Sequence, residues 1–224
     1  MRKWGIVITA VYALILLAVL IPGTALLSSD KFNGWPAFFR GLGETYSTWM
    51  VWVPIVILVS GQALLLFLSV DTSQKRLKPR AHILVSCAVG AILTALLTSA
   101  VIWSLGFVIR GNDFWDHIFE TNLSVLAFWA GLWLLWGILF YLYFRNSSEW
   151  VTRIISWLLK GSVLELLIVV PCHVIVRRRH DCSAPIATSF GIATGIAIML
   201  LSFGPSILLL YKKRLDEYST RKTA

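Results

Sequence analysis

The chain has 224 residues, of which 58% are hydrophobic and only 14% are charged. A soluble domain carries roughly 25% charged residues, so this composition excludes an ordinary soluble protein. The formal net charge of +9 would suggest nucleic-acid binding in a soluble chain, but most of the basic residues here flank long apolar runs. In a membrane protein such residues set the topology and contact anionic lipid, and we expect no nucleic-acid partner.

The first half of the chain contains three apolar runs that predict transmembrane helices. A helix needs about 20 apolar residues to cross the roughly 30 Å hydrocarbon core of a bilayer. The first run extends from Trp4 past Leu20, which is too long for the apolar region of a signal peptide. The second run covers about 49–70 and the third covers 81–109. All three are predicted to span the membrane.

The connections between these runs predict their placement relative to the bilayer. Trp35–Phe39 lies in a connection that is too polar to span, so its aromatic residues predict a short interfacial segment. Lys75, Arg76, Lys78 and Arg80 follow the second run. Positive charge gathers in cytoplasmic loops, so this loop is predicted to be cytoplasmic.

The second half of the chain predicts two or three further crossings. The runs at about 123–144 and 185–211 are long and apolar, whereas 154–176 is interrupted by Glu165 and Pro171. The positive-inside bias favours six transmembrane helices with both termini in the cytoplasm. Five helices plus a re-entrant or interfacial segment at 154–176 are the second choice. The sequence thus predicts an all-α, polytopic helical membrane bundle that forms a single integral membrane domain over residues 1–224.

Glu165 is the carboxylate predicted to lie deepest in the membrane. Ionisable groups at such depth are costly and usually face the bundle interior, where they serve ion or proton paths or bind a polar partner. The alternative is a neutral glutamic acid that forms a hydrogen bond to a neighbouring helix. We therefore treat Glu165 as a candidate ligand-binding residue.

Cysteine and histidine residues cluster just after Glu165, at Cys172, His173, His180 and Cys182. Thiolate and imidazole are the usual zinc donors, so a metal cofactor is one hypothesis, although the spacing matches no strong zinc pattern. A disulfide between Cys172 and Cys182 is a second hypothesis, provided that this loop faces an oxidising compartment. The third interpretation is that the cysteines are packing residues and the histidines are interfacial.

Three consecutive arginines, Arg177, Arg178 and Arg179, lie between these cysteines. Guanidinium groups bind phosphate or carboxylate through paired hydrogen bonds, and lipid headgroups are the nearest such anions. Topology anchoring is the commoner task of such runs. The anion-binding hypothesis gains weight in the six-helix topology, which places the arginines on the outer face where the positive-inside rule does not explain them.

Small residues form a stripe on the last predicted helix, at Ala187, Gly191 and Gly195. Such spacing lets two helix backbones approach closely. It predicts packing against another membrane helix, either within the chain or in a second copy in a homo-oligomer.

These patterns predict a non-enzymatic membrane protein, an accessory subunit or small binding component with an anion or lipid-headgroup site around residues 165–182. Membrane lipids are the predicted partners. One alternative is a small transporter or channel that uses Glu165, with Ser162, Thr94 and Thr98 as the other polar residues of its path. A second alternative is a membrane metalloenzyme built on the cysteines and histidines.

Overall fold

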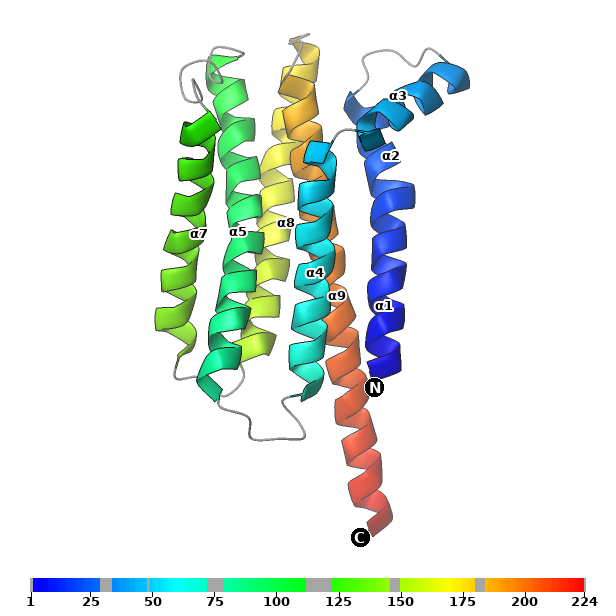
Figure 1. The fold of residues 1–224 in the computed structure, drawn as a ribbon, viewed down its shortest axis with the longest axis vertical. Helices are drawn as coiled ribbons and strands as arrows, with labels where there is room; N and C mark the ends of the chain where they lie inside the picture. Colours follow the sequence, from blue (N-terminus) through cyan, green and yellow to red (C-terminus); the bar gives the residue numbers. More distant parts are fainter. Residues whose placement is uncertain are drawn as a thin grey trace.

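The structure is a computed structural model of the 224-residue chain, and it describes most of that chain. The described ranges are 2–28, 34–47, 49–71, 79–111, 122–145, 150–179 and 184–223. Over these ranges the chain is almost entirely helical and has no strand. The long helices stand side by side in one bundle (Figure 1). The predicted all-α membrane bundle is therefore confirmed.

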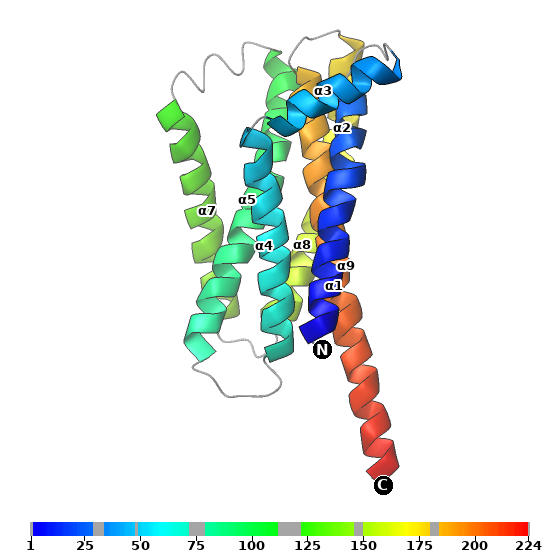
Figure 2. The same ribbon diagram turned by 45° about the vertical axis from the view of Figure 1, so that its right-hand side comes forward.

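The first half of the bundle begins with one nearly continuous helix. It consists of α1 (Arg2–Ile15), the π-helical turn η1 (Leu16–Leu20) and α2 (Ile21–Ser28). Next, α3 (Trp35–Ser47) lies across the upper end of the bundle, and α4 (Trp49–Asp71) returns to the lower end (Figures 1 and 2). The predicted interfacial segment is therefore longer than the aromatic residues alone suggested.

The second half contributes α5 (Pro79–Arg110), α7 (Asn122–Phe144), α8 (Trp150–Arg178) and α9 (Ala184–Thr223). Gly111 directly follows α5, and its φ of 64° is a left-handed conformation that glycine adopts without strain. The amide of Gly111 donates to the Phe107 carbonyl at 3.0 Å, which satisfies one of the last carbonyl groups of the helix.

Five described helical stretches are long and apolar enough to cross a membrane, and α3 with α4 forms a sixth candidate that is bent by 71°. Helix α4 alone has 23 residues. At 1.5 Å per residue it is about 35 Å long, which is enough to span the bilayer core. Helix α8 is continuous over 29 residues and runs the length of the bundle (Figure 1). The re-entrant segment that we considered at 154–176 is therefore not observed.

Helix α9 extends farther than the apolar run predicts. We expected it to end near Tyr211, but it continues to Thr223 and its lower end projects beyond the bundle (Figures 1 and 2). Seven of the twelve residues from Lys212 to Thr223 are Lys, Arg, Leu or Glu, which favour helix in water, so the helix does not stop where its apolar run stops. Both chain ends lie at the lower end of the bundle.

Helix α9 occupies the middle of the bundle. It contacts α8 and α5 on one side and α1, α2 and α4 on the other, whereas α7 packs on α5 at the edge (Figure 2). Trp133 on α7 donates from Nε1 to the Ala88 carbonyl on α5 at 3.2 Å. The outward face of α7 is apolar, with Leu123 and Leu126 largely exposed. Such a surface is unusual in a soluble monomer and suits contact with lipid.

Candidate functional site

Glu165 lies at the middle of α8, inside the bundle. It is 15 residues from the helix start at Trp150, about 22 Å along the axis at 1.5 Å per residue. Only 1% of its surface is exposed. The helix begins at Trp150, earlier than the predicted residue 154, so Glu165 lies farther from the helix start than the sequence suggested.

The carboxyl group of Glu165 packs against the backbone of α9. A Cβ atom built on Gly195 would lie 1.8 Å from Glu165 Oε2 and 3.0 Å from Leu166 Cδ2. The glycine at this position therefore makes room for the carboxyl group. Among the residues that the structure describes, neither carboxyl oxygen has a hydrogen-bond partner.

The polar residues that we had grouped with Glu165 bind elsewhere. The hydroxyl of Ser162 donates to Leu159 at 2.9 Å, and that of Thr94 donates to Gly90 at 2.8 Å. Thr98 donates to the carbonyl of Thr94 at 3.0 Å. Each of these bonds stays within its own helix. Within the described ranges, the three hydroxyls thus form no hydrogen-bonded path with the carboxyl group.

Two further contacts join α8 to α9 above Glu165. Val169 Cγ1 lies 3.0 Å from the position of a Cβ on Gly191, and Ser104 Oγ of α5 lies 3.6 Å from the same position. One turn higher, His173 Nδ1 and Thr188 Oγ1 are 2.8 Å apart and buried. Glu165, Val169 and His173 recur every four residues, so these contacts lie along one face of α8.

The tautomer of His173 decides which group donates in the His173–Thr188 pair, and the bond from Thr188 to Pro185 favours one assignment. The Thr188 hydroxyl also donates to the Pro185 carbonyl at 3.3 Å. A neutral His173 then donates from Nδ1 to Thr188, which leaves Nε2 as an acceptor. Nε2 is buried and has no hydrogen-bond partner among the described residues.

The three arginines lie at the upper end of α8, and they differ in their surroundings. Arg177 is half-buried, whereas Arg178 and Arg179 are exposed. Arg179 Nη1 donates to the carbonyl of Val108 at 2.6 Å, near the C-terminus of α5. Helix C-termini carry unsatisfied carbonyls and partial negative charge, which favours a guanidinium group there. The side chain of Arg178 is exposed. Unlike Arg179, it has no described hydrogen bond to a helix carbonyl.

Two of the four cysteine and histidine candidates fall within the described ranges. Cys172 is buried on α8, next to His173. His180 and Cys182 lie outside the described residues, so the disulfide and the four-ligand metal site remain predictions. Within the described residues, no three His, Cys, Asp or Glu side chains gather closely enough to hold a metal ion.

The small-residue stripe of α9 faces other helices of the same chain. Gly191 meets α8 and α5, Gly195 meets α8, and Ala187 packs near Phe107 and Val176. These approaches occur within one copy. The structure thus provides an intramolecular partner for each of the three small residues.

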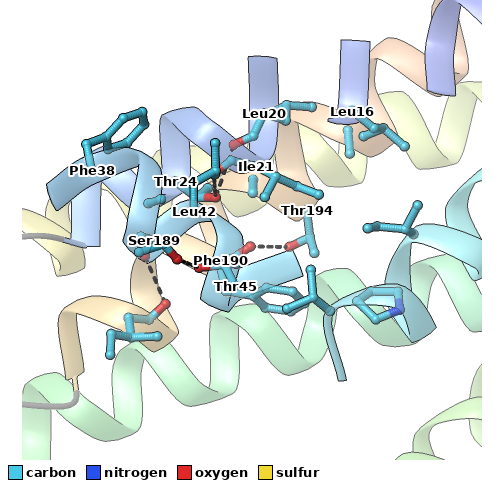
Figure 3. Close-up of a pocket in the computed structure, with 18 of the residues that line it drawn as sticks. Leu16, Leu20, Ile21, Thr24, Phe38, Leu42, Thr45, Ser189, Phe190 and Thr194 are labelled. Atoms are coloured by element: carbon cyan, nitrogen blue, oxygen red, sulfur yellow. Dashed lines mark hydrogen bonds between the residues drawn. The ribbon is translucent and has the colours of Figure 1, made fainter. Parts of the chain in front are cut away.

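The sequence did not predict an apolar cavity of about 500 Å³ that lies near the upper end of the bundle. Four segments converge on it: the first helix, α3, α4 and α9 (Figure 3). Its walls include Leu16, Leu20, Phe38, Pro54 and Phe190. The hydrophobic periodicity of the sequence does not predict this cavity, because each of the four segments, taken by itself, has the pattern of an ordinary lipid-facing or packing surface.

The polar groups that line the cavity are hydroxyls already bound within their own helices. Thr24 donates to Ile21 at 2.8 Å, Ser189 donates to Ile186 at 2.9 Å, and Thr194 donates to Gly191 at 2.8 Å. None of the described lining residues is ionisable. The cavity therefore offers a mainly apolar environment whose described polar groups are hydroxyls.

Helix α3 closes the upper end of this cavity and is attached to its neighbours. The Tyr46 hydroxyl donates to the Leu17 carbonyl in η1, and Trp52 Nε1 of α4 donates to the Tyr46 carbonyl at 2.8 Å. Phe38, Leu42 and Thr45 of α3 line the cavity. Trp35 and Phe39, on an adjoining face of α3, are each 62% exposed, which suits a helix in the membrane interface.

Helix α9 separates the cavity from the Glu165 contacts. Thr194 lines the cavity, whereas the next residue, Gly195, meets Glu165 on the other side.

No protein-family model, curated protein sequence or solved structure matches the chain.

Proposed function

We propose that this protein is a non-enzymatic membrane component that binds an anionic amphiphile such as a membrane lipid. One acyl chain occupies the cavity between the first helix, α3, α4 and α9. The observation that carries the proposal is the cavity itself, about 500 Å³ in volume, apolar, and lined by no ionisable group among the described residues. Sites of this size and polarity hold apolar ligands or chains.

The headgroup preference is expected to come from the arginine end of the bundle. The cavity includes Ile186 and Ser189, near the start of α9, and α8 ends with its arginines at the same end of the bundle (Figure 1). Phosphate is the anionic group that lipids present at this depth. The exposed Arg178 is best suited to meet it, since Arg179 is engaged with Val108.

The test is lipid retention. Protein purified in mild detergent is expected to carry about one phospholipid per chain, measured by extraction and mass spectrometry, with anionic lipid enriched over the membrane average. In Arg178→Gln the enrichment is expected to fall roughly fivefold, because one basic residue near the surface contributes about 1 kcal/mol toward anionic lipid.

Arg145→Gln is the matched control, because Arg145 is an exposed arginine that follows α7 at the opposite end of the bundle. It should retain the wild-type lipid profile. A wild-type protein without retained lipid would contradict the proposal. Equal losses of anionic lipid in both variants would show that general charge, and not a site, sets the preference.

The proposed orientation places both termini in the cytoplasm. Helix α4 ends and α5 begins at the end of the bundle where both termini lie, and the sequence between them contains Lys75, Arg76 and Lys78. Basic connections are retained on the cytoplasmic side. Single cysteines at Arg110 and Arg145, both exposed, test this. A membrane-impermeant maleimide should label the first in intact cells and the second only after permeabilisation, with the unsubstituted chain as control. The reverse labelling pattern would show that the termini lie on the outer side of the membrane.

A further inference from the structure

Unpaired polar atoms lie along the face of α8 that meets α9. Both carboxyl oxygens of Glu165, the Ser104 hydroxyl and His173 Nε2 are buried without a hydrogen-bond partner among the described residues. Glu165 and His173 are eight residues apart, about 12 Å along the helix, and Ser104 enters between them from α5 at the level of Gly191. The half-buried Arg177 continues the same face by one more turn.

This arrangement differs from scattered polar packing residues. Several other core hydroxyls donate to carbonyls of their own helices, as Ser99 does to Leu96 at 2.8 Å. A buried polar atom without a partner costs free energy, and water that makes two to four hydrogen bonds commonly supplies the missing partners. Glu165, Ser104, His173 and Arg177 follow one another at intervals of about one helical turn. This spacing suits a short file of water molecules that runs from the middle of the membrane to the upper surface.

We infer that Glu165 is a proton-binding site reached from the Arg177–Arg179 end of the bundle through a file of polar groups formed by His173 and Ser104. A proton from water at that end passes along the file to one carboxylate oxygen of Glu165 and forms the neutral acid. The reverse step returns the proton to the same side. Gly195 holds the site open, because any Cβ there would meet Glu165 Oε2.

Glu165 and His173 are the ionisable groups within the file, and the other described ionisable groups of the packed helices lie outside it. On α8, Lys160 is exposed, and His173, Cys172 and Arg177 lie toward the upper end. On α1, Tyr12 donates to the carbonyl of Ala197, two residues after Gly195, at 3.0 Å. The described side chains of α9 include no ionisable group, and those of α5 include only Cys87 and Arg110, toward opposite helix ends.

Infrared spectroscopy of the full chain in lipid vesicles tests the inference. The difference spectrum of wild type minus Glu165→Gln isolates the carbonyl band of a neutral Glu165 side chain. We expect this band to weaken as the pH rises and to shift on transfer into heavy water. In Ser104→Ala the deuterium exchange should slow roughly tenfold, the effect of one lost hydrogen bond.

Ser86→Ala is the matched control. Ser86 is also a buried serine of α5 whose hydroxyl has no described partner, but it lies toward the lower end. Its exchange rate should equal that of wild type. A band that is absent at every pH, constant with pH, or equally fast to exchange in both serine variants would overturn the inference. Because α9 separates this site from the cavity, lipid retention in the same preparations reports on the proposed function independently.

Discussion

Replacing Gly195 by alanine is expected to destabilise the protein by about 1–3 kcal/mol, the usual cost of overpacking a core. The added Cβ would meet Glu165 Oε2 at 1.8 Å and Leu166 Cδ2 at 3.0 Å. The carboxyl end of Glu165 is flexible, but the residue is 1% exposed, so it cannot move aside without disturbing the contact between α8 and α9. Thermal unfolding in detergent, followed by size-exclusion chromatography, measures the loss.

The matched control is Gly131→Ala on α7, where a Cβ would meet nothing within 4 Å. That variant should be as stable as wild type or slightly more stable, because alanine favours helix by about 1 kcal/mol over glycine. Combining Gly195→Ala with Glu165→Ala should recover part of the loss, since the clashing carboxyl is then gone. Equal stability of the two single alanine variants would show that α8 and α9 are farther apart than described.

Replacing Ala193 by tryptophan is expected to remove most of the retained lipid. Ala193 lines the cavity from α9, next to Phe190 and Thr194, and an indole there would occupy the space proposed for an acyl chain. Retained phospholipid, measured by mass spectrometry of the purified protein, should fall at least about tenfold, as expected when an apolar chain loses its binding site.

Ala130→Trp provides the comparison for this substitution, because Ala130 is exposed on α7. It introduces the same side chain on the outer surface and should leave retained lipid unchanged. If the two tryptophan variants retain equal amounts of lipid, the lipid lies on the outer surface and the cavity is not its site.

The sequence predicts the membrane helices well because their length is set by the bilayer. The run at 123–144 became α7 at Asn122–Phe144 almost unchanged. The prediction was weakest at 154–176, because Glu165 and Pro171 interrupt the apolar pattern there. In the structure α8 crosses both residues without a break, and α9 provides the surface that covers the carboxyl group. Coverage by a neighbouring helix is a tertiary effect that the local pattern does not contain.

The site was only partly predictable for the same reason. Glu165 and Gly195 each stood out in the sequence, but their contact depends on the register between two antiparallel helices, which hydrophobic periodicity does not specify. The bond from Arg179 to Val108 likewise joins residues that are 71 positions apart. The cavity was not predicted at all, since its walls come from four segments that are individually unremarkable in composition.

Photolabelling tests the central claim most directly. The probe is a phospholipid with a phosphate headgroup and a diazirine near the end of one chain, incorporated into vesicles with the purified protein. The lipid-binding proposal predicts that the label is recovered on peptides containing Leu16 to Leu20 and Phe190 to Ala193, and that Ala193→Trp abolishes it. Label confined to the exposed face of α7, or unaffected by Ala193→Trp, would contradict the proposal.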